Sequence, residues 1–177
     1  MYLLSAGTPN IVIQVNLGHG LDQPWIAYKY GFSDSYGGYW LGFENLYKLS
    51  NNGKPWKFCV DLKDEFGFVF TIPYNEYMQD GESVGYTFFV AGATGSYDPF
   101  GSTSRKYKFS TKDVNNQPCC CAAQAATCKG GWWYSCTTSM VSVTTVLYGA
   151  GTCGFFYSLP FGPPIKFVSS YIKIKQA

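Results

Sequence analysis

Two consecutive segments with alternating side chains constrain the fold of this chain most strongly. Residues 57–63 place apolar and polar side chains on opposite faces: Phe58, Val60 and Leu62 against Lys57, Cys59, Asp61 and Lys63. After the short link DEFG the alternation continues with Phe66, Phe68, Phe70 and Ile72. A period of two is typical of strands with one buried face, and a short link makes such strands antiparallel neighbours. We therefore predict an antiparallel pair whose buried face holds both apolar sets.

Shorter patterns predict the other elements. Strands are expected at residues 11–15, 85–91 and 171–175, the last returning to the first sheet. A short helix should begin at Pro24 and end at Gly31, and a second should cover residues 44–49. The Asn52-Gly53 pair is a hairpin signal. The fold class that results is α+β, with a central, mainly antiparallel sheet and short helices.

The chain reads as a single domain over residues 1–177, which is long enough to bury a core. We expect a sheet part at 11–96, a loop-rich lobe at 97–164, where Gly, Ser, Thr, Cys and Pro dominate, and a returning strand at 165–177. No internal repeat or long linker divides it.

The seven cysteines predict disulfides in an oxidising compartment. Their positions are Cys59, Cys119, Cys120, Cys121, Cys128, Cys136 and Cys153. The C-x2-C pairs typical of zinc sites are missing, and adjacent cysteines pair poorly with one another. Each of the three consecutive cysteines therefore needs its own partner. The odd count leaves one thiol, with two alternatives: it links subunits or it is a buried free cysteine.

Composition favours an extracellular binding or matrix protein. Aromatic residues make up 19% of the chain and charged residues only 14%, against roughly 25% charged residues in an average soluble protein. A net charge of +2 gives no support for a nucleic-acid partner, and the lysines of the last strand are interpreted as a solvated face. No apolar run reaches the ~18 residues of a membrane span. Residues 1–10 do not form a signal peptide, so a secreted protein would be represented here by a mature or partial chain.

The sequence offers no catalytic constellation. The one histidine, His19, lies in a glycine-rich turn without a nucleophile nearby. Asp61, Asp64 and Glu65 surround a strand end and are interpreted as solvated turn charges rather than a glycosidase pair. We expect no enzymatic activity.

Six motifs in a fixed order resemble the fibrinogen C-terminal-like (fibrinogen-related) domain. They are W-x-x-Y-K-x-G-F at 25–32, WLGFEN at 40–45, VDL at 60–62, KFSTKD at 108–113, the two tryptophans before Cys136, and IKFVSSYIKIK at 165–175. The resemblance implies a secreted, disulfide-bonded, non-catalytic binding domain with a twisted sheet and a loop-rich lobe. It also implies an N-terminal subdomain before the first strand, which is missing here, so that the chain is expected to be a fragment or a shortened domain.

The resemblance further implies a calcium loop, which is altered in this chain. The family continues after KFSTKD with D-x-D-x-D, whereas here Asn115 and Gln117 stand at the two carboxylate positions. Calcium prefers anionic oxygen ligands, so the loss of two charges should weaken binding severely. The alternative is a loop clamped by the cysteines that follow.

The resemblance also implies a disulfide between Cys121 and Cys136 and a pocket for acetyl groups or peptide ends. Its expected walls are Trp133, Tyr134, Cys136, Thr137, Tyr148 and Tyr157. Thr137 stands where the family has a histidine. Trp132 and Trp133 have a competing interpretation as core of the lobe.

Two functions follow as hypotheses. The first is a recognition or adhesion domain with lectin-like binding of glycans or acetylated groups, or binding of an extracellular protein. The second is a structural matrix or fibre-forming module that assembles as a homo-oligomer or through disulfides, which low charge and surplus cysteines favour.

Overall fold

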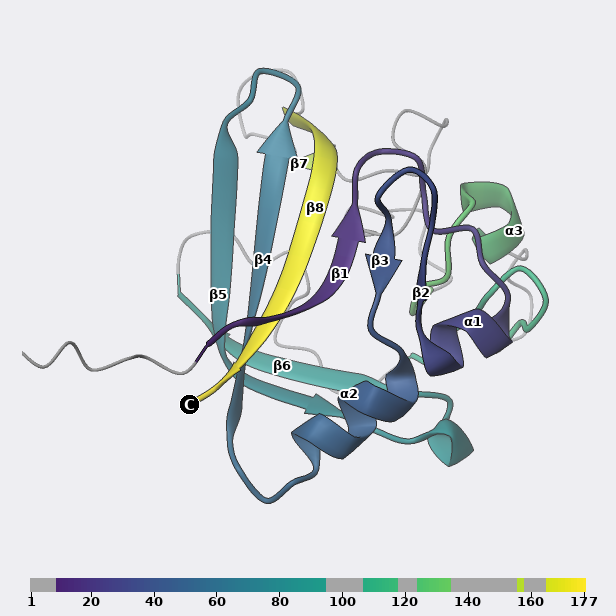
Figure 1. Ribbon diagram of the computed structural model, residues 1–177, viewed down its shortest axis with the longest axis vertical. Helices are drawn as coiled ribbons and strands as arrows, with labels where there is room; N and C mark the ends of the chain where they lie inside the picture. Colours follow the sequence, from purple (N-terminus) through teal and green to yellow (C-terminus); the bar gives the residue numbers. More distant parts are fainter. Residues whose placement is uncertain (1–8, 95–106, 118–123, 135–155, 158–164) are drawn as a thin grey trace, which may run out of the picture.

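The computed structural model of the chain describes residues 9–94, 107–117, 124–134, 156–157 and 165–177. An antiparallel sheet with the strand order β2-β3-β1-β8-β4-β5-β6, and β7 beside β8, organises them (Figure 1). The strands are β1 Ile11–Asn16, β2 Phe32–Ser33, β3 Tyr39–Trp40, β4 Trp56–Asp64, β5 Val69–Gln79, β6 Phe88–Ala93, β7 Phe156–Tyr157 and β8 Ile165–Gln176. The predicted α+β class with a mainly antiparallel sheet is confirmed.

The last strand of the chain lies in the middle of the sheet. β8 pairs with β1 on one side and with β4 on the other, so that Ile174 is opposite both Ile11 and Phe58. Its inward side chains Ile172 and Ile174 are 3% and 1% exposed. The predicted return of the C-terminal segment to the sheet is therefore confirmed. The strand covers Ile165–Gln176 and is longer than the alternating segment 171–175 from which it was predicted.

Both predicted helices are present, as α1 Trp25–Tyr30 and α2 Phe43–Ser50. A 3-10 turn η1 (Glu82–Val84) and a short helix α3 (Gln124–Cys128) complete the described helical segments. The backbones of Gly31, after α1, and Gly42, before α2, approach each other closely and have φ values of +97° and +98°. This contact fixes the two helices next to each other at the end of the sheet.

Three local predictions are corrected. Phe66, Phe68 and Phe70 are exposed rather than buried, because the chain turns over residues 64–68, β5 begins only at Val69, and Phe70 lies next to the end of the strand pair. The Asn52-Gly53 turn joins α2 to β4 and makes no hairpin. The third strand starts at Phe88 rather than residue 85, since Gly85 and Tyr86 have positive φ values after the 3-10 turn.

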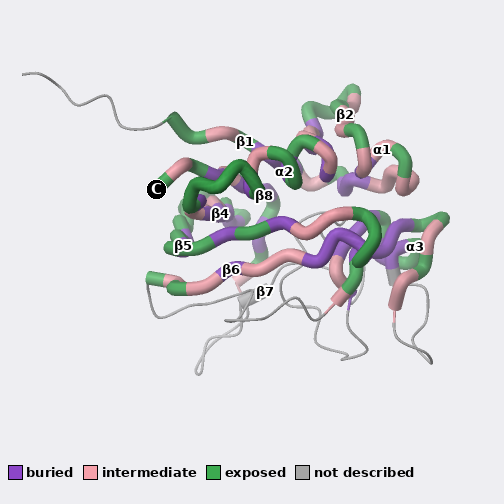
Figure 2. Tube along the Cα trace, turned by 90° about the horizontal axis from the view of Figure 1, so that it is seen from below, coloured by how far each residue is buried: buried purple, intermediate pink, exposed green. Residues whose placement is uncertain are grey.

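Buried residues line the inner side of the sheet and the segments that pack on it (Figure 2). The alternation of β4 is confirmed, with Phe58, Val60 and Leu62 at 4% exposure or less. Among the described residues, no helix has the length and apolar character that crossing a bilayer would need.

Candidate functional site

Five aromatic side chains connect the sheet to the lobe, and we call them the aromatic hub: Tyr28, Trp40, Phe43, Phe109 and Trp133. Phe109 is fully buried at their centre. Its ring centroid lies 4.6 Å from that of Phe43 and 4.9 Å from those of Tyr28 and Trp133. Tilted and edge-on contacts of this kind are favourable beyond the area that they bury. The hub therefore fixes residues 107–117 and 124–134 of the lobe on α1, β3 and α2.

Hydrogen bonds reinforce the same attachment. Ser110 and Trp132 exchange both backbone hydrogen bonds, with N–O distances of 2.9 and 3.0 Å. The N–H of Gly131 donates to the hydroxyl of Tyr28 at 3.0 Å, and Trp133 Nε1 donates to the carbonyl of Tyr86 at 2.6 Å. A Cβ on Gly131 would come within 2.8 Å of the rings of Tyr28 and Phe109, so this position accepts only glycine.

The structure describes the side chains of two of the expected pocket residues, Trp133 and Tyr134. Trp133 is half-buried and packs in the hub, while Tyr134 is 1% exposed and its hydroxyl donates to the carbonyl of Gly130 at 2.5 Å. Burial raises the pKa of Tyr134, so its hydroxyl stays protonated at physiological pH. With the buried Trp132, these residues form a packed floor of the lobe.

The remaining pocket residues are only partly covered by the structure. Cys136, Thr137 and Tyr148 lie outside the described residues, as does the expected Cys121–Cys136 disulfide. Tyr157 belongs to β7, but its side chain is also outside the described part. The pocket therefore stays a prediction.

Asp113, at the start of the altered calcium loop, serves the protein itself. Its Oδ1 accepts the backbone N–H of Trp25, the first residue of α1, at 2.9 Å and the hydroxyl of Thr111 at 2.7 Å. Desolvation acts to raise the pKa of this carboxyl, but the hydrogen bonds from Thr111 and Trp25 outweigh it and the pKa is lowered. The carboxylate thus supplies an acceptor to a helix N-terminus, where negative charge is favourable.

Hydrogen bonds within the loop close the remaining turns. Asn115 Oδ1 accepts the N–H of Gln117 at 3.1 Å, and the amide of Asn116 donates to the carbonyl of Phe109 at 2.8 Å. The loop thus has one carboxylate, already engaged, and neutral amides where calcium needs charged ligands. Among the described residues, no three His, Cys, Asp or Glu side chains gather as a metal site. We therefore propose that this loop does not hold calcium.

Stability of the wild-type chain is therefore predicted to be insensitive to calcium. Thermal unfolding in millimolar calcium and in EDTA should give the same midpoint. The double variant Asn115→Asp/Gln117→Asp restores the two charges. Calcium should raise its free energy of unfolding by about 2.7 kcal/mol once the calcium concentration reaches about 100 times Kd. Asn115→Ala/Gln117→Ala, which adds no charge, should show no such rise. A calcium-dependent rise in the wild type would contradict the prediction.

The two described cysteines have different states. Cys128 is fully buried and disulfide-bonded. Cys59 is a free, half-buried thiol on the face of β4 that also carries Asp61. Desolvation and the charge of Asp61 raise the pKa of this thiol, which keeps it protonated and slow to react.

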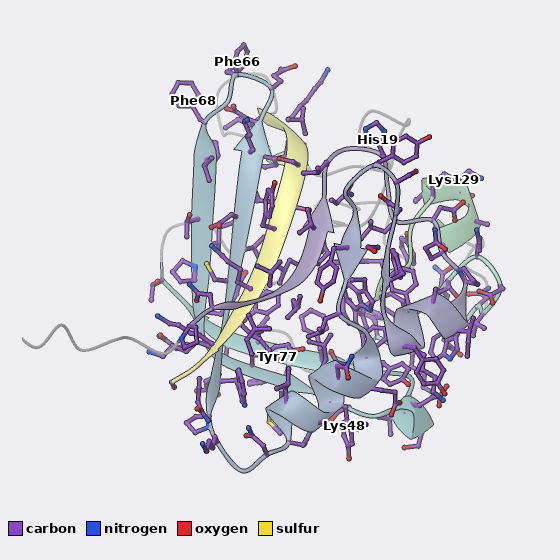
Figure 3. The ribbon with its side chains drawn as sticks, viewed as in Figure 1. His19, Lys48, Phe66, Phe68, Tyr77 and Lys129 are labelled. Atoms are coloured by element: carbon purple, nitrogen blue, oxygen red, sulfur yellow. The ribbon has the colours of Figure 1, made fainter. Side chains whose placement is uncertain are left out.

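The described candidates for catalysis have structural roles. His19 stacks on Tyr36 with ring centroids 4.6 Å apart, at the periphery of the molecule (Figure 3). Asp61 forms an ion pair with Lys173, and Asp64 accepts hydrogen bonds from its own turn. The described carboxylates therefore form no acid–base pair.

The sequence motifs and the topology agree with one family. The model for fibrinogen beta and gamma chains, C-terminal globular domain, matches residues 6–152, more than half of the chain. The chain belongs to this family. Fibrinogen-like domains of this group are non-catalytic binding domains, and this fibrinogen-like domain is not an enzyme.

The relatives that match this fibrinogen-like domain are much longer than the matched segment. The domain is 35% identical to dog angiopoietin-2 over 98 residues, which is 55% of this chain and 20% of that protein. It is 33% identical to human angiopoietin-related protein 7 over 101 residues, 55% of this chain and 28% of that protein. The chain thus spans between a fifth and just over a quarter of the length of these relatives.

Solved structures support the same fold. The fibrinogen-like globe domain of human ANGPTL2 superposes with a TM-score of 0.71 at 27% identity, covering 94% of this chain and 79% of that one. A lamprey fibrin D-dimer, solved with the peptide Gly-His-Arg-Pro-amide, superposes with a TM-score of 0.70 at 18% identity, covering 97% of this chain and 62% of that one. At this identity the likeness shows the fold alone.

Sequence reasoning missed the hub as a site-forming unit. Tyr28 and Phe109 were residues of family motifs without an assigned role, and Gly131 was one glycine among 20. Their positions inside ordered motifs are the signal that could have indicated a shared contact.

Proposed function

We propose that this fibrinogen-like domain is a secreted recognition domain whose loop-rich lobe binds an extracellular ligand. The observation that carries the proposal is the packed floor of Trp132, Trp133 and Tyr134, which the hub attaches to the sheet. We expect the residues that follow in sequence to use this packed segment as a fixed support, which lowers the entropic cost of binding. Membership of a family of binding domains supports the same function.

The ligand class we favour is a glycan or another acetylated group, bound in a lectin-like manner. The expected walls are Trp133, Tyr134, Cys136, Thr137, Tyr148 and Tyr157. Tyr134 is buried, so we expect it to support the other walls from below the surface. The other walls combine aromatic side chains with hydroxyl groups and include no Asp, Glu, Lys or Arg, which suits an acetamido methyl and its neutral amide.

A second candidate is a structural module linked through disulfides. The free, half-buried thiol of Cys59 favours it, because even a slowly reacting thiol can form a disulfide in an oxidising compartment. In that case native material should give a ladder on non-reducing electrophoresis, and Cys59→Ser should shorten it.

The recognition proposal is tested on an array of glycans and N-acetylated ligands, probed in EDTA. The wild type is expected to bind acetylated spots. Thr137→Arg, which adds bulk and charge at the expected rim, should lose them, while Lys48→Ala on α2 should keep them. If the array gives no signal and native material gives a disulfide ladder, the recognition proposal is wrong and the structural function is favoured.

A further inference from the structure

The turn between β4 and β5 carries the two most exposed large apolar side chains of the described residues, Phe66 and Phe68. Phe66 is 79% exposed, Phe68 68% and Val69 61%. Figure 3 shows both phenylalanines at the end of the hairpin, which projects at one end of the long axis of the molecule. We call residues 64–69 the apolar tip. Soluble proteins rarely expose such clusters without a binding role.

Asp64 holds the apolar tip in one conformation. Its Oδ1 accepts the N–H of Phe66 at 3.0 Å and that of Phe68 at 2.8 Å, and its carbonyl accepts the N–H of Gly67 at 3.1 Å. Its own N–H donates to the carbonyl of Phe68 at 3.0 Å. The side chain of Asp64 is buried by these contacts, at 4% exposure. The phenylalanines are therefore presented by a rigid turn.

The same hydrogen bonds lower the cost of moving the turn from water into an apolar medium. The backbone donors of Phe66, Gly67 and Phe68 are bonded to Asp64, and that of Glu65 donates to the carbonyl of Lys166 at 3.3 Å. An N–H without a partner is costly in an apolar medium, and each donor of residues 65–68 has one. Glu65 is exposed and charged, so it limits how deeply the tip can enter.

Two lysines flank the apolar tip. The Cε of Lys63 lies 4.0 Å from the position that a Cβ on Gly67 would take, so its ammonium group lies beside the turn. Lys166 is exposed on β8, next to Glu65. The carboxylates of Asp64 and Glu65 lie in the same turn, but that of Asp64 is buried and accepts hydrogen bonds from the backbone of its own turn. The exposed apolar side chains and the two lysines are therefore the groups available to the apolar layer and the phosphates of a bilayer surface.

We propose that the apolar tip inserts into the interfacial layer of a bilayer that contains anionic lipids, with Phe66 and Phe68 below the headgroups and Lys63 and Lys166 among them. A projecting tip enters a fluid layer without a matching cavity, whereas a protein partner would have to supply a pocket. This contact is separate from the hub and the floor of the lobe, so it leaves the lobe accessible.

Co-sedimentation with vesicles of phosphatidylcholine, with and without phosphatidylserine, tests the proposal. The wild type should bind the phosphatidylserine vesicles more strongly. Phe66→Ser/Phe68→Ser should lower the partition coefficient about tenfold or more. Lys63→Gln/Lys166→Gln should lower it about fivefold per lysine on anionic vesicles and leave binding to pure phosphatidylcholine unchanged.

The matched control is Ile26→Ser/Tyr30→Ser, which removes comparable apolar surface from α1, where these residues are 58% and 62% exposed. Its vesicle binding should equal that of the wild type, with folding of every variant checked by circular dichroism. Absence of the wild type from the pellet, or an equal loss in the control, would overturn the proposal. A wild-type dimer in light scattering that Phe66→Ser/Phe68→Ser abolishes, without vesicle binding, would assign the tip to contacts between copies.

Discussion

Replacing Phe109 with alanine is expected to lower the free energy of unfolding by about 3–5 kcal/mol, the range for large aromatic truncations in a core. The side chain is fully buried and contacts the rings of Tyr28, Phe43 and Trp133. The loss would remove the centre of the hub and with it the contact between lobe and sheet. Denaturant titration followed by tryptophan fluorescence measures it.

Phe66→Ala is the matched control, since the same truncation at a 79% exposed position should change stability by about 0.5 kcal/mol or less. Equal effects of the two substitutions would show that Phe109 is not a central contact. The account of how the lobe is attached would then be wrong.

Gly42→Ala is the second substitution with a large expected effect, about 2–6 kcal/mol. The φ value of +98° with a ψ value of 136° is a conformation that L-residues rarely adopt, and it costs about 1–3 kcal/mol. A Cβ at this position would also lie 2.5 Å from the carbonyl carbon of Tyr30 and 2.7 Å from the nitrogen of Gly31. Because these are backbone atoms, α1 and α2 would have to move apart, which adds about 1–3 kcal/mol for overpacking.

Gly53→Ala measures the cost of a positive φ value at a position without a steric contact. Gly53 has a φ of +78°, and no atom lies within 4 Å of the position of its Cβ, so about 1–2 kcal/mol is expected. The difference between the two variants in thermal and denaturant unfolding reports the contact between the helices. If Gly42→Ala costs no more than Gly53→Ala, that contact contributes nothing.

The motifs that make the family recognisable are the ones that meet in the hub. The segment at 25–32 contributes Tyr28, WLGFEN contributes Trp40 and Phe43, and KFSTKD contributes Phe109. Residues that pack against one another restrict each other's size and shape, so their types and order remain readable from sequence. The family, the helices and the central strands could therefore be predicted.

Local patterns were misleading where the core ends. The alternation through Phe66 and Phe68 is that of a buried strand, but a pattern with a period of two does not indicate how far the opposing layer extends. Tyr134 is buried in a small cluster with Ala125, Cys128 and Trp132, within one irregular segment whose packing is not encoded by periodicity. The pocket depends on loops with few regular periods, which gave sequence reasoning no pattern to follow.

Hydrogen–deuterium exchange of the domain with and without its best acetylated array ligand tests the central claim most directly. Binding by the lobe predicts slower exchange within residues 107–157 and unchanged exchange at the hairpin over 64–69 and in α2. Protection confined to the sheet or the hairpin, or no ligand that changes exchange at all, would contradict recognition through the lobe.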